Sequence, residues 1–192
     1  MNEITGDLFE SEKADAICIT TNGFVNAQGA NTMGRGCAGE AKARWPGIQM
    51  TAGRALGFAG NRVVKLTYTE QGQIFLPECR KPLHNRHYVP YHVVTFPTKP
   101  DLCNLEDLLP YYQRRNDQGA SPHPGWKAKS NLDMIAASAC QLVGLVGEQG
   151  WQSVVLPRPG CGAGELSWED EVRPILSRIL DGRFYTITFP PR

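Results

Sequence analysis

The chain has 192 residues, of which 41% are hydrophobic and 20% charged, a composition typical of a soluble globular protein with its own core. Its net charge of +1 is too small to indicate nucleic acid or an anionic membrane as an obligatory partner. No apolar stretch reaches the roughly 20 residues of a transmembrane helix, and the polar N-terminus differs from a secretory signal. We therefore expect a monomeric cytoplasmic protein with one domain, 1–192.

The six cysteines are scattered along the chain without a CxxC pair, as expected for free thiols in a reducing compartment. Four potential metal ligands, Cys79, His84, His87 and His92, lie close together in the sequence. Their spacing matches no known zinc signature. We therefore expect neither a metal site nor a cofactor.

In chain order, the first predicted elements are a strand and a helix. Residues 15–21 form a continuous apolar and β-branched run, as expected for a strand buried on both faces. A helix is predicted from about Gly36 to Trp45, where Pro46 ends it. Three further strands are predicted at residues 61–68, 72–78 and 91–98.

Residues 100–129 are long for a connection in a compact domain, and they mix a short apolar patch with Gly, Pro, Asn and Asp. We interpret them as an insertion beside a ligand cleft, with one helical turn near Leu105–Leu109. A lid over the ligand is one role open to this insertion.

The best helical pattern runs from Ser130 to Gly147, with one apolar stripe. Ser130 and Asp133 have the spacing of a capping box at its start. A strand is predicted at residues 152–158, directly after this helix.

The pattern near the C-terminus contains a conflict. Ser167 and Asp170 indicate a helix start, but Pro174 would then fall inside the helix. A short turn followed by a helix with Pro174 in its first turn resolves the conflict. A last strand is predicted at residues 183–189, and the alternation of strands and helices predicts an α/β fold with a largely parallel central sheet.

Two glycine clusters could bind an anion through backbone N–H groups. The first, MGRGCAGE, starts at Met33 and contains the pattern GxGxxG. About a dozen residues separate it from the preceding strand, and no acidic residue lies between Glu40 and Glu70 to hold a ribose. This context excludes a NAD-dependent dehydrogenase.

The second cluster, PRPGCGAGELSW, starts at Pro157, after a predicted strand. Neither cluster has the GK[ST] ending of a P-loop. Two such loops at one edge of the sheet could hold the two phosphates of a pyrophosphate. From the glycines alone, this interpretation and a pair of ordinary turns are equally supported.

Several segments, taken together and in order, resemble the macrodomains that bind ADP-ribose. TGDLFESEKADAICITTN is similar to the family opening, MGRGCAGEAKARWPG to the first ligand loop with its helix, and PRPGCGAGELSW to the diphosphate loop. FPTK before residues 100–129 and WKAKSNL at their end resemble a contiguous segment of DarG-type antitoxins, which remove ADP-ribose from DNA. The same branch contains terminal ADP-ribose glycohydrolases that act on proteins. The resemblance implies a three-layer α/β/α fold with a mixed, largely parallel sheet.

The resemblance also implies roles for individual residues. Asp7, next to Leu8, would accept a hydrogen bond from the adenine amino group, and Asn22, after Thr21, would bind the distal ribose. From the residues alone, a cap or turn is favoured for Asp7, and an ordinary turn is open for Asn22. The other implied ADP-ribose ligands are Met33, Gly34, Arg35, Gly36, Pro159, Gly160, Cys161, Gly162, Ala163 and Gly164.

Lys99, in FPTK, is the residue for which the resemblance implies catalysis. A lysine desolvated at the edge of the cleft could lose its proton, although nearby phosphates would oppose this shift. The resulting amine could attack the anomeric carbon of the ring-opened sugar and form a Schiff-base-like adduct. Arg35 and Arg158 are expected to be structural or surface residues.

Gly164 departs from the protein-directed glycohydrolases, which carry an Asp after GCGL. Glycine resembles the DNA-directed antitoxins, and Glu165 could substitute as an acid or base or face solvent. The prediction is an ADP-ribosyl hydrolase that acts on a modified macromolecule, foremost a DNA base, with an ADP-ribosyltransferase toxin as a candidate partner. A non-catalytic ADP-ribose reader, a protein ADP-ribosylglutamate hydrolase and an ADP-ribose 1″-phosphate phosphatase remain alternatives.

Overall fold

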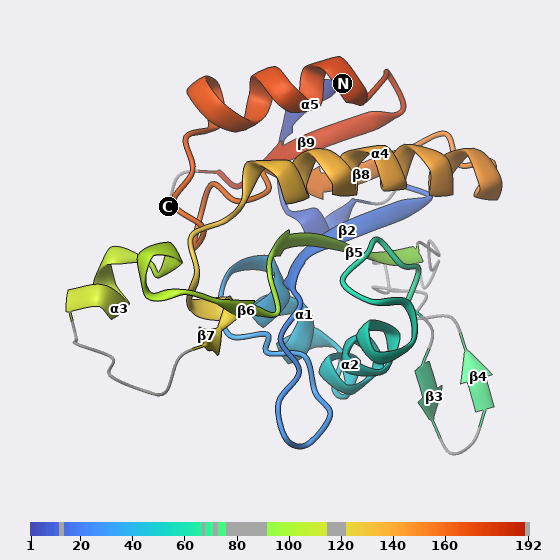
Figure 1. Cartoon of the computed structure of the whole chain (residues 1–192). Helices are drawn as coiled ribbons and strands as arrows, with labels where there is room; N and C mark the ends of the chain where they lie inside the picture. The colour runs from blue at the N-terminus through green and yellow to red at the C-terminus, as the bar shows by residue number, and fades with distance from the viewer. Residues whose placement is uncertain (12–13, 67, 71–72, 76–91, 115–121, 191–192) are drawn as a thin grey trace.

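A five-stranded sheet forms the centre of the computed structural model, which describes residues 1–11, 14–66, 68–70, 73–75, 92–114 and 122–190. The strands lie in the order β1-β9-β8-β2-β5, and each neighbouring pair is parallel (Figure 1). They are β1 (Asn2–Thr5), β2 (Ala16–Asn22), β5 (His92–Lys99), β8 (Val154–Pro157) and β9 (Phe184–Thr188). The predicted α/β fold with a largely parallel sheet is confirmed.

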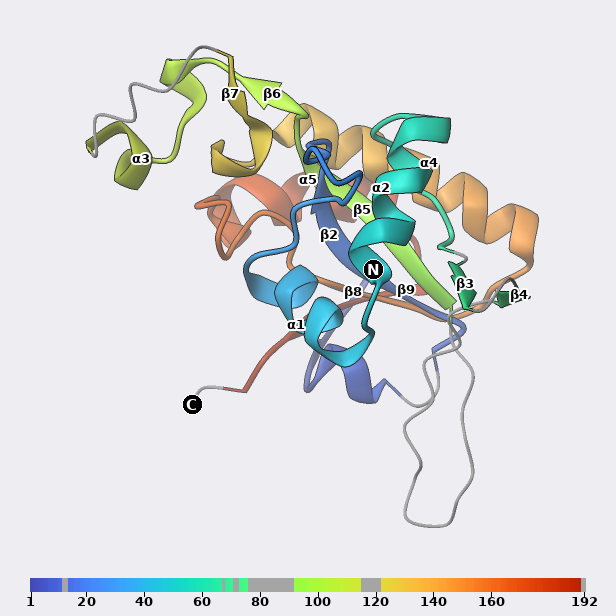
Figure 2. The same cartoon turned by 90° about the horizontal axis from the view of Figure 1, so that it is seen from below.

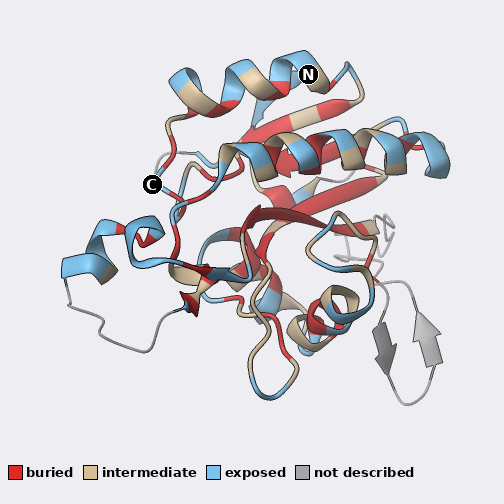
Figure 3. Ribbon diagram, viewed as in Figure 1, coloured by how far each residue is buried: buried red, intermediate tan, exposed pale blue. Residues whose placement is uncertain are grey.

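Helices cover both faces of the sheet. One face carries α1 (Gly36–Arg44) and α2 (Ile48–Ala59), and the other carries α4 (Leu132–Gln149) and α5 (Arg173–Ile179). Alternate residues of β2 point to opposite faces, so that Ile17 and Ile19 pack with α1 and α2, whereas Ala16 and Cys18 pack with α4 and α5. Figure 3 shows the result, in which the central strands are buried and α4 and α5 are exposed along their outer sides.

The start of α4 corrects a prediction, because Ser130 and Asp133 do not form a capping box. Asn131 is the N-cap, and its side-chain oxygen accepts a hydrogen bond from the Met134 N–H at 2.9 Å. Asn and Ser cap helices about equally well, so the pattern alone did not separate the two neighbours. Ser130 is buried against Gly164 instead.

The last helix forms as predicted. The Ser167 hydroxyl accepts a hydrogen bond from the Asp170 N–H and begins a π-helical turn over Trp168–Val172. Helix α5 follows directly, with Pro174 in its first turn. The proline therefore stands in the first turn of α5 and not in the helix interior.

Two elements of the N-terminal half have no signal in the sequence pattern. Helix α2 contains Gly53 and Gly57, which lower helix propensity. Gly53 is required by packing, because a Cβ there would overlap the carbonyl oxygen of Gly29. All four residues of β1 are exposed, so this strand lacks the alternation of apolar and polar residues that predicts a strand.

Residues 61–66 do not form the predicted strand, which corrects the prediction for 61–68. They run antiparallel to β5 with a single isolated bridge. The Thr95 hydroxyl accepts a hydrogen bond from the Val64 N–H and donates one to the Arg62 carbonyl, both at 2.9 Å, so a side chain interrupts the backbone ladder. The next strands, β3 (Tyr68–Glu70) and β4 (Gln73–Phe75), pair antiparallel.

The described parts of residues 100–129, which are 100–114 and 122–129, project from the sheet at the end of β5, as Figures 1 and 2 both show. They contain β6 (Leu102–Cys103), a 3-10 turn (Leu105–Asp107), α3 (Pro110–Arg114), β7 (His123–Pro124) and a second 3-10 turn (Gly125–Lys127). Cys103, Leu108 and Ala128 form a small core of their own, and Tyr112 packs on it. The first 3-10 turn confirms the predicted helical turn.

Three of the four potential metal ligands, Cys79, His84 and His87, lie outside the described residues. Within the described ranges, no cluster of three or more His, Cys, Asp or Glu side chains could hold a metal ion. The described cysteines are free. No helix among the described residues is long and apolar enough to span a membrane.

Candidate functional site

A cavity of about 880 Å³ lies at the carboxyl ends of the parallel strands, where ligands bind in open α/β sheets. The last residues of four neighbouring strands line it, and in sheet order these are Thr188 of β9, Pro157 of β8, Asn22 of β2 and Lys99 of β5. Three steps between strands make this wall roughly 14 Å long. The cavity is therefore elongated across the sheet, and it suits a ligand with two different ends.

The first glycine cluster forms one side of the cavity. Gly34, Arg35 and Gly36 line it, followed by Cys37 and Ala38 in the first turn of α1. Arg35 is the N-cap of α1 and provides no side-chain hydrogen bond to it. The first N–H groups of a helix have no intrahelical partner, and the Arg35 side chain does not cap them here, so the positive end of the helix dipole lies at the cavity. Such a helix start favours an anion.

The second glycine cluster lies opposite, between β8 and the turn that precedes α5. Residues 160–164 all line the cavity. The Cys161 N–H donates to the Arg158 carbonyl at 3.3 Å, so it is used inside the loop. Among the described residues, the N–H groups of Gly162 and Ala163 have no acceptor, and both residues are exposed. These two exposed groups are donors that the loop leaves open to a ligand.

Gly164 is a glycine because its surroundings leave no room for a side chain. A Cβ at this position would overlap the Ser130 hydroxyl and would lie 2.5 Å from the Gly160 carbonyl oxygen. Ser130 is 6% exposed and lines the cavity, and its hydroxyl has no hydrogen-bond partner among the described residues. A hydroxyl thus occupies the space in which a side chain at 164 would begin.

Lys99 lies where the cavity, the second glycine cluster and residues 100–129 meet. Its Nζ donates to the Ala163 carbonyl at 3.0 Å and to the Trp126 carbonyl at 3.4 Å. The side chain is 9% exposed, and this burial lowers the pKa of Lys99 from 10.5 to about 8. The charge of Glu165 opposes this lowering of the pKa, whereas that of Arg35 adds to it. Two carbonyls hold the amine in place and leave one of its N–H positions for a ligand.

Asn22 and Asp7 both make hydrogen bonds within the fold. The side chain of Asn22 donates to the Thr32 carbonyl at 2.8 Å and accepts from the Phe24 N–H at 3.0 Å, which holds the loop after β2. Asp7 accepts from the Phe9 N–H at 2.8 Å as a cap, and it forms an ion pair with Arg44 at 3.3 Å. Asn22 lines the cavity, whereas Asp7 is not among its lining residues.

The structure brings most of the predicted site residues to one cavity. Those that line it are Thr21, Asn22, Gly34, Arg35, Gly36, Lys99, Gly160, Cys161, Gly162, Ala163 and Gly164. Asp7, Leu8, Met33, Pro159 and Glu165 are not among the lining residues. Leu8 and Met33 belong instead to the core between the sheet and α1 and α2. Glu165 is exposed, with a left-handed φ of 58°.

Several lining residues have no signal as site residues in the sequence. Leu109, Tyr112 and Trp126 belong to residues 100–129, and Ser130 precedes α4. Trp126 is part of the WKAKSNL segment that carried the resemblance, and this position was the one available signal. Phe189 follows β9 at the opposite end of the cavity.

Two further lining residues are held in unreactive states. Arg158 forms an ion pair with Glu3 at 3.1 Å and lies over the Trp168 ring, 4.9 Å from its centroid. These contacts agree with the structural role expected for Arg158. Burial raises the pKa of the Cys161 thiol to about 11, so the side chain is a thiol and not a nucleophilic thiolate near neutral pH.

No protein-family model and no curated protein sequence matches the chain. Among solved structures, it is similar to the macrodomain of Mycobacterium tuberculosis DarG, with a TM-score of 0.60 and 23% identity over 100% of this chain and 97% of that chain. The macrodomain of Thermus aquaticus DarG gives a TM-score of 0.59 and 22% identity, over 99% of this chain and 97% of that chain. The structure of Thermosipho africanus DarTG in complex with ADP-ribose gives a TM-score of 0.62 and 19% identity, over 98% of this chain and 41% of that chain. The chain therefore has the macrodomain fold.

Proposed function

We propose that the cavity binds ADP-ribose and that Lys99 removes this group from a modified macromolecule, foremost a DNA base. The observation that carries the proposal is the buried amine of Lys99, held by two carbonyls at one end of a cavity with open backbone donors at its centre. A lysine with a pKa of about 8 is partly neutral near physiological pH, as a nucleophilic amine requires.

The arrangement of the cavity supports ADP-ribose as the ligand. The start of α1 and the N–H groups of Gly162 and Ala163 provide donors from two sides for a diphosphate. Lys99 at the end of β5 would then meet the distal ribose, and Phe189 after β9 would lie at the adenosine end. DarTG of Thermosipho africanus, which shares the fold, was solved with ADP-ribose bound.

The chemistry of the proposed reaction needs only the lysine and water. The bond between the anomeric carbon and the ring oxygen opens, the ring oxygen takes up a proton, and the carbon stays bound to the modified base as an iminium. The neutral Nζ of Lys99 adds to this carbon. The bond from the carbon to the base then breaks, and the base leaves with a proton from Nζ. The result is an imine between Lys99 and the sugar. Water then hydrolyses the imine, which releases ADP-ribose and restores the amine.

The preference for DNA rests on residue 164. A carboxylate at this position would assist release from protein carboxylates, and the packing of Gly164 against Ser130 leaves no space for one. Glu165 influences the pKa of Lys99 through its charge but does not line the cavity. The site therefore lacks a second acid or base at the position where the protein-directed enzymes have one.

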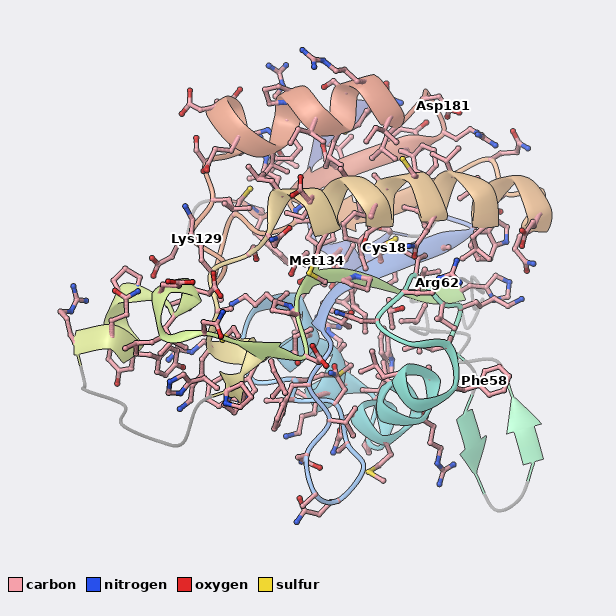
Figure 4. The ribbon with its side chains drawn as sticks, viewed as in Figure 1. Cys18, Phe58, Arg62, Lys129, Met134 and Asp181 are labelled. Atoms are coloured by element: carbon pink, nitrogen blue, oxygen red, sulfur yellow. The ribbon has the colours of Figure 1, made fainter. Side chains whose placement is uncertain are left out.

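The test offers ADP-ribosylated DNA and ADP-ribosylated protein to the wild type, to Lys99→Ala and to Lys129→Ala. Lys129, labelled in Figure 4, is an exposed lysine that does not line the cavity, so it is the matched control. We expect turnover of the DNA substrate by the wild type and Lys129→Ala only. Cyanoborohydride added during turnover should trap ADP-ribose on Lys99, which peptide mass spectrometry detects.

Other results would lead to other assignments. Full turnover by Lys99→Ala would remove the lysine from the mechanism. Binding of ADP-ribose in calorimetry, without release from any substrate, would identify a reader. Release of phosphate from ADP-ribose 1″-phosphate would identify a phosphatase, and no binding at millimolar ADP-ribose would refute the whole proposal.

A further inference from the structure

An aromatic wall lines the cavity beside Lys99. Tyr112 of α3 and Trp126 both line the cavity, and their rings meet edge to face, with centroids 5.6 Å apart and an interplanar angle of 86°. Leu109 adds an aliphatic side chain to the same wall. Tyr112 and Trp126 are only partly buried, so their rings keep surface for a further ligand.

This aromatic wall begins directly at the reacting centre. The Trp126 carbonyl lies 3.4 Å from the Nζ of Lys99, and Trp126 itself lines the cavity. Residues 100–114 and 122–129 follow β5 and project from its carboxyl end, next to Lys99 (Figures 1 and 2). The glycine clusters, by contrast, follow β2 and β8 in the chain. The group attached to the anomeric carbon would therefore leave toward Tyr112 and Trp126.

A positive charge accompanies the two rings. The Nζ of Lys127 lies 5.6 Å from the Tyr112 ring centroid and 5.5 Å from the Trp126 ring centroid. Aromatic faces combined with a cation are the features with which proteins bind single-stranded nucleic acid, because bases stack on the rings and phosphates meet the cation. A carboxylate leaving group from a protein could pair with the Lys127 ammonium, but it would gain nothing from the two ring faces, which suit a planar base.

We propose that Tyr112 and Trp126 form a subsite that stacks the departing nucleobase of a single-stranded nucleic acid, with Lys127 facing its backbone phosphate. The inference rests on the proposed function and names the substrate class of the same site. It assigns Tyr112, Trp126 and Lys127 the role of recognising the modified base, while the glycine clusters hold ADP-ribose.

The experiment measures binding in the Lys99→Ala background, where no turnover occurs. The ligands are a single-stranded oligonucleotide with one ADP-ribosylated base and free ADP-ribose. We expect Tyr112→Ala to weaken binding of the oligonucleotide by about 5- to 100-fold and that of ADP-ribose by less than about twofold. Tyr112→Phe, which keeps the ring, should retain both affinities.

Two control variants separate stacking from folding. Phe58→Ala removes a ring that is 97% exposed on α2 and does not line the cavity, and it should leave both affinities unchanged. Tyr112→Leu keeps apolar volume on the small core of Cys103, Leu108 and Ala128 but has no aromatic face. It should bind the oligonucleotide as weakly as Tyr112→Ala, with an unchanged melting temperature.

The outcomes distinguish the two proposals. If Tyr112→Ala weakens both ligands equally, or neither, the stacking subsite is refuted and the ADP-ribose cavity stands. If free ADP-ribose binds and the modified oligonucleotide binds no more tightly, the subsite is also refuted. If ADP-ribose does not bind even to the wild type, the proposed function fails, and the subsite fails with it.

Discussion

The Lys99 side chain is buried without an ion pair in the described part of the chain, and two neutral carbonyls hold it. Carbonyl oxygens orient an amine whether or not it is charged, whereas a paired carboxylate would favour the ammonium form. The position of the residue after a buried strand was predictable from FPTK. The partners of its Nζ were not, because Ala163 and Trp126 reach it from distant parts of the sequence.

The lowered pKa of Lys99 predicts the pH dependence of the reaction. Below pH 8 the ammonium form predominates, so kcat/KM should rise about tenfold per pH unit and level off above a pKa of about 8. Lys99→Arg, which keeps its charge at all accessible pH values, should lower kcat/KM by on the order of 10²-fold. Rates of release of ADP-ribose from DNA between pH 6 and 10 provide the measurement. A profile without a rise through pH 8 would contradict it.

The packing around Gly164 predicts the effect of a substitution there on stability. A Cβ there would overlap Ser130 and crowd the Gly160 carbonyl, so Gly164→Ala should lower the free energy of unfolding by about 1–3 kcal/mol. Gly162→Ala is the matched control, because a Cβ at Gly162 meets nothing within 4 Å. Urea unfolding of both variants gives the comparison, and equal stabilities would show that the loop relaxes freely.

In helix α4 the observed N-cap, Asn131, lies one residue after the predicted one, Ser130. The sequence predicts its span to within two residues, because the apolar stripe is long and regular. The identity of the cap depends on which neighbour the packing at Gly164 buries, and no local pattern contains that information. Helix α2 and strand β1 lie at the other extreme, since the packing of Gly53 and the pairing of β1 with β9 define them.

The cap of α4 leads to a prediction for adjacent residues. Asn131→Ala should lower the free energy of unfolding by about 1 kcal/mol, because it removes the acceptor of the Met134 N–H. Ser130→Ala should change it by less than about 0.5 kcal/mol, since the Ser130 hydroxyl has no partner to lose among the described residues. Thermal and urea unfolding of the two variants test this. The opposite order would restore Ser130 as the cap.

At the scale of the whole molecule, the order of the strands decides the order of the groups along the cavity. Strand β9, near the C-terminus, lies between β1 and β8, so Phe189 lies at one end and Lys99 at the other. The sequence predicts that the glycine clusters share one edge, because parallel strands end together. It does not predict that β9 and β1 extend the sheet beyond β8, because their pairing joins the two ends of the chain.

This linear order predicts which part of ADP-ribose each end of the cavity contacts. Phe189→Ala should weaken ADP and ADP-ribose by a similar factor, because both ligands carry adenosine. We expect about 5- to 10-fold for the loss of an exposed ring that the adenosine would cover. Lys99→Ala should weaken ADP-ribose and leave ADP unchanged, since ADP has no distal ribose. The two residues lie at opposite ends of the wall, so their free-energy changes for ADP-ribose should add in the double variant. Calorimetry with the two ligands tests all three statements, and a loss of ADP affinity in Lys99→Ala would reverse the proposed direction of the ligand.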